Sequence, residues 1–116
     1  MPEAKVEMSV RDGAPTVRII DIKGEVTAFA APVLAEAFAQ AAAGDTKTVV
    51  LNFGGMEYMN SGGIGLLVTT LIRANRNGQQ MRAYGLSEHY REILSLTRLD
   101  EAIHIFDDEA GAVAGS

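Results

Sequence analysis

Cysteine is absent from this chain, which excludes disulfide bonds, thiolate metal sites and cysteine nucleophiles. Basic residues are scarce: 10 Lys and Arg stand against 15 Asp and Glu, and the formal net charge is -5. A protein that binds nucleic acid needs a basic face for the phosphates, and an acidic balance also disfavours anionic membrane surfaces. We therefore expect neither nucleic acid nor a membrane as a direct partner.

Long hydrophobic runs are also missing. The most apolar stretch, residues 64–72, is about half the length that spans a bilayer, and residues 1–7 lack the apolar run of a signal peptide. These features predict a soluble, cytoplasmic protein. With 116 residues and 47% apolar content, the chain fits one globular domain. We expect it to span residues 1–116, with an ordered core over about 6–113 and a small flexible tail at 114–116.

The order of hydrophobic segments predicts an α/β fold. Period-2 and β-branched runs favour strands, and i, i+3, i+4 spacing favours helices. Expected strands cover 6–10, 17–22, 48–53, 81–84 and 103–106, and expected helices begin near Pro32, Ser61, Ser87 and Asp107. This order, β-β-α-β-α-β-α-β-α, requires crossover connections and hence a largely parallel sheet with about four helices packed on it. A hairpin turning at Asp12-Gly13 would make the sheet mixed.

The strongest helix signal follows the central strand. Ile64, Leu67, Val68, Leu71 and Ile72 recur at helical spacing and predict one buried face. The turn pair Asn77-Gly78 predicts where this helix ends.

Residues 59–65, Met-Asn-Ser-Gly-Gly-Ile-Gly, join that strand to that helix. Ser61 is expected to cap the helix, whereas three glycines in its first turns oppose helix stability by up to roughly 1 kcal/mol each. Open α/β sheets place their sites at such strand ends, and free helix N–H groups stabilise anions. A phosphate on Ser61 would add about -1.5 to -2 charges there. The alternative is a tight turn in which Ser61 caps and the glycines let the helix pack closely.

Other candidates are weaker. His89 and His104 form no recognisable zinc spacing, and the acidic residues 107–109 are typical of a helix start. Arg73 and Arg76 are expected on a solvated helix face. Neither a phosphate-binding G-x-x-x-x-G-K-[ST] loop nor a G-x-S-x-G elbow occurs. We therefore expect no metal, no cofactor and no enzyme activity.

Several segments together resemble one known family. Residues 57–67 resemble the Asp-Ser-Ser/Thr-Gly-Leu-Gly segment of the STAS domain of bacterial anti-sigma factor antagonists. Residues 23–26 are similar to its Gly-Glu-Leu-Asp turn, residues 48–53 to its central strand, and residues 85–87 and 96–99 to its fourth strand and following helix. The resemblance covers roughly residues 6–113 and implies the element order given above.

The resemblance implies a function. Members of this family bind an anti-sigma factor that is also a serine kinase, with a GHKL-type ATP-binding domain, and thereby free the sigma factor. Phosphorylation of the loop serine blocks binding, and a serine phosphatase restores it. By position, the phosphorylated residue here is Ser61. The implied partner-binding residues are Gly24, Glu25, Thr27, Met59, Asn60, Ser61, Gly62 and Gly63.

This chain departs from the family pattern at three positions. Asn60 and Thr27 stand where Asp is usual, and Gly62 replaces a second hydroxyl residue. The loss of two carboxylates removes repulsion toward a phosphate but also removes contacts that a kinase reads. An unphosphorylated STAS scaffold or small-ligand sensor is therefore the alternative hypothesis, and a serine enzyme using Ser61 is a third.

Overall fold

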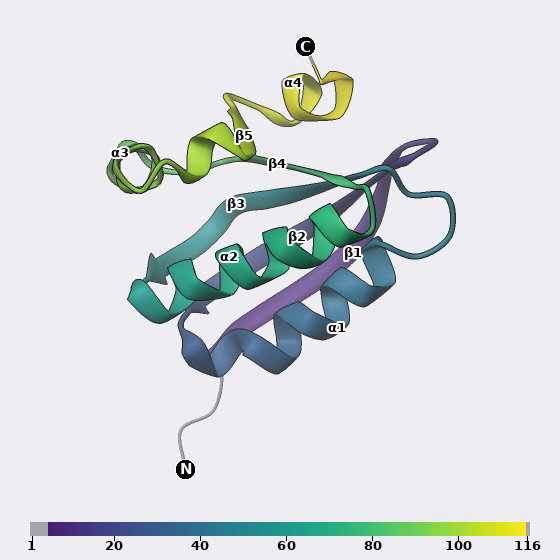
Figure 1. Cartoon of the computed structure of the whole chain (residues 1–116). Coiled ribbons are helices and arrows are strands. Elements are labelled where there is room, and N and C mark those ends of the chain that lie inside the picture. The colour runs from purple at the N-terminus through teal and green to yellow at the C-terminus, as the bar shows by residue number, and fades with distance from the viewer. Residues whose placement is uncertain (1–4, 116) are drawn as a thin grey trace.

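The computed structural model describes residues 5–115 as five strands that form one mixed sheet, with helices on both of its faces (Figure 1). The strands are β1 (Val6–Ala14), β2 (Val17–Val26), β3 (Thr48–Met59), β4 (Gln80–Tyr84) and β5 (Ile103–Phe106). The helices are α1 (Ala31–Ala41), α2 (Ser61–Arg76), α3 (Glu88–Leu96) and α4 (Glu109–Ala114), with short 3-10 turns η1 (Ala28–Ala30) and η2 (Leu99–Glu101).

The sheet has the order β1-β2-β3-β4-β5. Only β1 and β2 are antiparallel, and the other neighbouring pairs are parallel. Parallel strands need crossovers, which α2 and α3 provide between β3, β4 and β5. The predicted fold class is therefore confirmed. Among residues 5–115, no helix combines the length and the apolarity that crossing a bilayer requires.

Two hydrophobic clusters occupy opposite faces of the sheet. The larger one places α1, α2 and α3 on the face that carries Leu51 and Phe53, with Phe38, Leu67 and Leu94 as their buried contributions. Figure 1 shows α1 and α2 side by side across this face. The smaller cluster joins α4 to the other face through Ala112. The strand residues it meets there are Val17, Ile19, Val50 and Tyr84.

The first hairpin turns later than predicted. Asp12 and Gly13 lie inside β1, where the register with β2 shifts between Asp12 and Ala14, and the turn falls between Ala14 and Val17. A Cβ at Gly13 would lie 3.0–3.1 Å from side-chain atoms of Ile19 and Val113. Gly13 therefore serves close packing, and the prediction of a turn at Asp12-Gly13 is wrong.

The buried face of α2 differs in part from the prediction. Leu67 is buried as predicted, and Ile64 and Leu71 pack partly buried against the core. The other buried residues are Gly63, Thr70 and Ala74, whereas Val68 and Ile72 are 37% and 47% exposed. Small residues let the helix approach the sheet closely, and the Thr70 hydroxyl is satisfied by donating to the Leu66 carbonyl at 2.7 Å.

The last helix of the described residues is α4. Ala114 is the last residue of α4, and Gly115 caps that helix in a left-handed conformation. Of the tail predicted at 114–116, only Ser116 lies outside the described residues.

Candidate functional site

Ser61 is the first residue of α2 and follows directly on the carboxyl end of β3. Its side chain is exposed, but it does not cap the helix. Asn60 does: its backbone is extended (φ -114°, ψ -174°), and its Oδ1 accepts the Gly63 N–H at 3.1 Å. The prediction that Ser61 is the N-cap is therefore wrong by one residue. The Ser61 hydroxyl has no hydrogen bond among residues 5–115, so it is free for another role.

The first turn of α2 keeps unpaired donors beside Ser61. The Ile64 N–H bonds the Asn60 carbonyl at 3.0 Å, whereas within the described part of the chain the N–H groups of Ser61 and Gly62 donate to nothing. No acidic residue occurs in this turn. Free N–H groups at a helix start attract negative charge, and no carboxylate of the turn opposes it.

Strand pairing and one tyrosine hold this junction in place. Met59, the last residue of β3, pairs with Val26, the last residue of β2. The Asn60 N–H donates to the Val26 carbonyl at 3.4 Å, and the Met59 N–H donates to the Tyr90 hydroxyl at 3.0 Å. Because β2, β3 and α3 all contact the junction, the backbone next to Ser61 is held in place by three elements of the fold. Met59 itself is 5% exposed and belongs to the core.

The three glycines of the segment have different surroundings. A Cβ at Gly63 would overlap the Val26 carbonyl oxygen, and one at Gly62 would lie 3.0 Å from the Ala28 nitrogen. These two glycines are explained by close packing of α2 on β2 and η1, as the alternative hypothesis supposed. Gly65 is exposed, and nothing lies within 4 Å of the Cβ that it lacks. The packing of the chain itself does not require a glycine at position 65.

An exposed line of residues continues from Ser61 along α2. Gly65, Val68 and Ile72 follow it at i+4, i+7 and i+11, all on the side opposite the buried residues. The large hydrophobic residues exposed within residues 5–115 are Phe29, Tyr58, Val68, Ile72 and Leu96. They lie on α2 itself, on η1 that packs against it, at the end of β3 and at the end of α3.

Only some of the other implied partner-binding residues adjoin this junction. Thr27 does, because its Oγ1 accepts the Phe29 N–H at 3.2 Å and so caps η1, which packs on α2. Gly24 and Glu25 lie within β2 and do not form the expected turn. Glu25 pairs with Tyr58, whereas Gly24 (φ +95°) faces β1, where a Cβ would overlap the Lys5 carbonyl oxygen.

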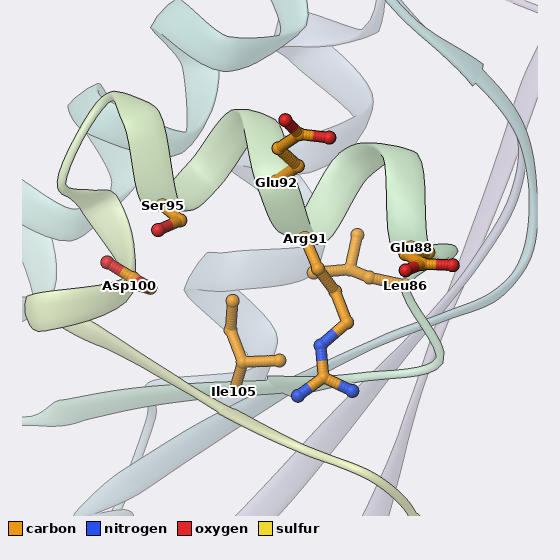
Figure 2. Close-up of a pocket in the computed structure, with 7 residues that line it drawn as sticks. All are labelled: Leu86, Glu88, Arg91, Glu92, Ser95, Asp100 and Ile105. Carbon is orange, nitrogen blue, oxygen red and sulfur yellow. The ribbon is translucent and has the colours of Figure 1, made fainter.

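A groove of about 790 Å3 lies between α3 and β5, away from Ser61. Figure 2 shows Arg91 extending from α3 toward Ile105, and Ser95 and Asp100 facing each other. Arg91 is paired with Asp107 at 2.9 Å. The groove is also lined by Leu86 and by two acidic residues of α3, Glu88 and Glu92. It contains no hydrogen-bonded pair of nucleophile and base.

No group of three or more possible metal-ligating side chains occurs in the described part of the chain. His89 is exposed and packs edge-on against Tyr90 at 5.0 Å. His104 is exposed on β5. Arg73 lies 5.1 Å from the ring centroid of Phe38, so it covers the core rather than standing free in solvent.

Four side chains with shifted pKa values form a polar network that links α4 to the sheet: Arg11, Asp21, Tyr84 and Glu109. Arg11 bonds Asp21 at 2.7 Å and Glu109 at 2.5 Å, and it thereby lowers the pKa of both carboxyl groups. These two acids in turn raise the pKa of Arg11. Burial, and the hydrogen bond that its hydroxyl donates to Glu109 at 2.8 Å, raise the pKa of Tyr84 to about 12. Asp108 caps α4, so the acidic run has the structural role expected for it.

Known proteins share both the sequence pattern and the fold. The sequence model of the STAS domain matches residues 5–112. An anti-sigma-B factor antagonist of Staphylococcus aureus is 27% identical over 86 residues, which are 74% of this chain and 80% of the relative. An anti-sigma factor antagonist from Mycobacterium paratuberculosis superposes with a TM-score of 0.79 at 20% identity, over 95% of this chain and 92% of that one. The phosphorylated form of the Bacillus cell fate determinant SpoIIAA gives 0.71 at 16% identity, over 95% and 100%.

Proposed function

This chain belongs to the STAS domain family, and we propose that it is an anti-sigma factor antagonist that binds a kinase-type anti-sigma factor and is switched off by phosphorylation of Ser61. Two neighbouring observations carry the proposal. The Ser61 hydroxyl is exposed and unbonded, and Gly65, which the packing of the fold does not require, lies one helical turn further along α2. A glycine that the fold does not need leaves room for a second protein to approach the helix.

The exposed face of α2 supports a protein partner. Exposed apolar side chains that gather on one face are typical of protein interaction sites. Val68 and Ile72 extend the line from Ser61, and Phe29 is exposed on η1, which contacts α2. We name Ser61, Gly65, Val68, Ile72 and Phe29 the docking face. Its apolar residues supply contact area for a partner. Ser61 lies at the end of this face that is nearest to the carboxyl end of β3.

Phosphorylation of Ser61 would change this face without changing the fold. The hydroxyl has no structural hydrogen bond, and Asn60 supplies the helix cap. A phosphate would bring about -1.5 to -2 charges and three acceptor oxygens, which the free N–H groups of Ser61 and Gly62 are placed to meet. A partner that buries Ser61 against apolar residues would then have to desolvate that charge, which is strongly unfavourable.

Two of the three departures from the family pattern, Asn60 and Thr27, still serve as helix caps. Asn60 Oδ1 and Thr27 Oγ1 each cap a helical turn, as an aspartate oxygen would. Their neutrality lowers the repulsion that a phosphate on Ser61 would meet. This supports phosphorylation at Ser61 rather than the unphosphorylated scaffold that these departures first suggested.

The test uses an anti-sigma factor with a GHKL-type ATP-binding domain from the same genome. We expect the unphosphorylated chain to form a stable complex with it, and ATP to add one phosphate that peptide mass mapping places on Ser61. The Ser61→Asp variant should bind at least 10-fold more weakly than the native chain, whereas Ser61→Ala should bind but accept no phosphate. A Ser61→Asp variant with native affinity would overturn the switch.

The same experiment addresses the other hypotheses. A complex that forms while no phosphoserine appears would instead select the unphosphorylated scaffold. Dephosphorylation by a serine phosphatase should restore binding if the switch is reversible. We place this regulation in the cytoplasm, without direct contact with nucleic acid or membrane. An enzyme finds no support, because no base bonds the Ser61 hydroxyl within residues 5–115.

A further inference from the structure

A second feature adjoins Ser61, on the side of α3. The start of α2 and the end of α3 enclose an open pocket of about 310 Å3, lined by Met59, Asn60, Ser61, Ile64, Ile93 and Thr97. The sequence offered no sign of it, because Ile93 and Thr97 lie more than 30 positions beyond Ser61 in the chain.

The lining of this pocket selects an uncharged occupant. None of its six residues carries a charge, and Met59, Ile64 and Ile93 supply its walls. The Thr97 hydroxyl is engaged in bonds to the carbonyls of Ile93 (2.9 Å) and Leu94 (3.2 Å), and Asn60 Oδ1 is engaged by Gly63. Apart from the Ser61 hydroxyl and the Asn60 amide NH2, the pocket therefore exposes mainly apolar surface to a ligand.

We propose that a large apolar side chain of the anti-sigma factor inserts into this pocket and anchors the complex. This inference rests on the proposed function and specifies how that partner is recognised. The volume admits one leucine-sized or phenylalanine-sized side chain, and interface anchors are commonly large side chains in desolvated pockets. The pocket is continuous with the docking face through Ser61 and Ile64. Leu96, which precedes Thr97 in the chain, is 77% exposed.

The pocket also gives the phosphorylation switch a physical basis. Ser61 is part of the pocket wall, so a phosphate on its Oγ stands at the opening. Inserting an apolar side chain beside a phosphate removes water from that charge and supplies no counter-charge, since the lining has none. Unphosphorylated Ser61 contributes only a small neutral hydroxyl, which permits insertion.

A pair of substitutions on α3 tests this proposal. Thr97→Met fills the pocket from its exposed rim, and Ser95→Met places the same side chain on the opposite side of α3, in the groove of Figure 2. We expect Thr97→Met to weaken binding of the anti-sigma factor by roughly 10- to 100-fold, because burial of one apolar side chain is worth about that factor. Ser95→Met should bind as the native chain does. Binding would be measured by isothermal titration calorimetry.

A second pair covers the case in which Thr97→Met fails to fold, which circular dichroism would reveal. Thr97→Glu puts a charge at the pocket rim without altering Ser61, and Ser95→Glu is its control. We expect Thr97→Glu to weaken binding about as much as Ser61→Asp does. Native affinity in both Thr97 variants would overturn the pocket proposal alone. If the native chain itself does not bind, the proposed function fails. Self-association of the native chain that Thr97→Met abolishes would make a second copy of this chain the occupant and overturn the proposal.

Discussion

The backbone N–H of Met59 donates a hydrogen bond to the hydroxyl of Tyr90 at 3.0 Å, across 31 positions of the chain. Through this bond α3 holds the last residue of β3, immediately before the cap of α2. Met59 also pairs with Val26 at the end of β2. The orientation of Ser61 therefore depends on three elements that are separate in sequence, and Tyr90 is a positioning residue for the site.

Removal of the Tyr90 hydroxyl should loosen the junction. Tyr90→Phe leaves the Met59 N–H without an acceptor in a largely buried position, so we expect the free energy of unfolding to fall by about 1–3 kcal/mol. The Met59 amide should also exchange its hydrogen faster, as measured by NMR. Tyr58→Phe is the control, because Tyr58 is 48% exposed and its loss of a hydroxyl should change stability by less than about 0.5 kcal/mol. Equal effects of the two changes would contradict the role given to Tyr90.

The helix cap predicts opposite results at two adjacent residues. Asn60→Ala removes the acceptor of the Gly63 N–H and should lower the free energy of unfolding by about 1 kcal/mol. Ser61→Ala should change it by less than about 0.5 kcal/mol, since the hydroxyl bonds nothing. Urea unfolding followed by circular dichroism measures both. A larger loss in Ser61→Ala than in Asn60→Ala would mean that Ser61 is the cap after all.

Two glycines of α2 should respond oppositely to alanine. Gly63→Ala drives a methyl group into the Val26 carbonyl, and overpacking of this kind costs roughly 1–3 kcal/mol or more. Gly65→Ala meets nothing within 4 Å and should stabilise the helix by about 0.5–1 kcal/mol. Thermal unfolding distinguishes the two.

The same Gly65→Ala protein provides a binding test. Its added methyl group stands on the docking face, so we expect weaker binding of the anti-sigma factor from a more stable chain. A gain in stability with unchanged affinity would show that the partner does not approach α2 at Gly65.

The network around Arg11 predicts how stability depends on pH. The pKa values of Asp21 and Glu109 lie below their ordinary values of 3.8 and 4.5 because both carboxylates bond Arg11. Below about pH 4.5 the unfolded chain binds more protons at these groups than the folded chain does. Their contribution is therefore present at neutral pH and is lost as the pH falls through the folded-state pKa values.

The Arg11→Met variant tests this sign. It should be less stable than the native chain at pH 7, and the difference should shrink as the pH is lowered from 5 toward 3 in urea titrations. Arg91→Met is the control: its partner Asp107 is 87% exposed, and such a pair contributes little. A difference that grows toward acidic pH would contradict the network.

Local signals were sufficient for much of the architecture. The strand at Ile103–Phe106 was predicted with its observed bounds, α2 ends at the Asn77-Gly78 turn, and Ser87 caps α3 through a bond from the Tyr90 N–H at 3.4 Å. Each depends on a few neighbouring residues and on hydrophobic alternation, which act before distant contacts form. The order of elements alone also required the parallel crossovers.

The errors share a physical cause. Ser61 and Asn60 are equally good caps locally, and the choice between them follows from the pairing of Met59 with Val26, which ends β3 one residue before Asn60. Periodicity marks Ile64, Leu67 and Leu71 correctly, but it also marks the exposed Val68 and Ile72 as core residues because it counts hydrophobic side chains. Periodicity does not take into account that a helix lying close to a sheet also buries small residues, which here are Gly63, Thr70 and Ala74.

The amino-acid sequence by itself determined the elements, their order, the mixed sheet and the serine at the head of the main helix, since these depend on short-range patterns and connection rules. The tertiary structure alone decided the rotation of α2, the division of its glycines into two that the fold requires and one that it does not, and the pocket that α3 completes beside Ser61. Those features depend on atoms that meet across many residues of chain, where local propensity carries no information.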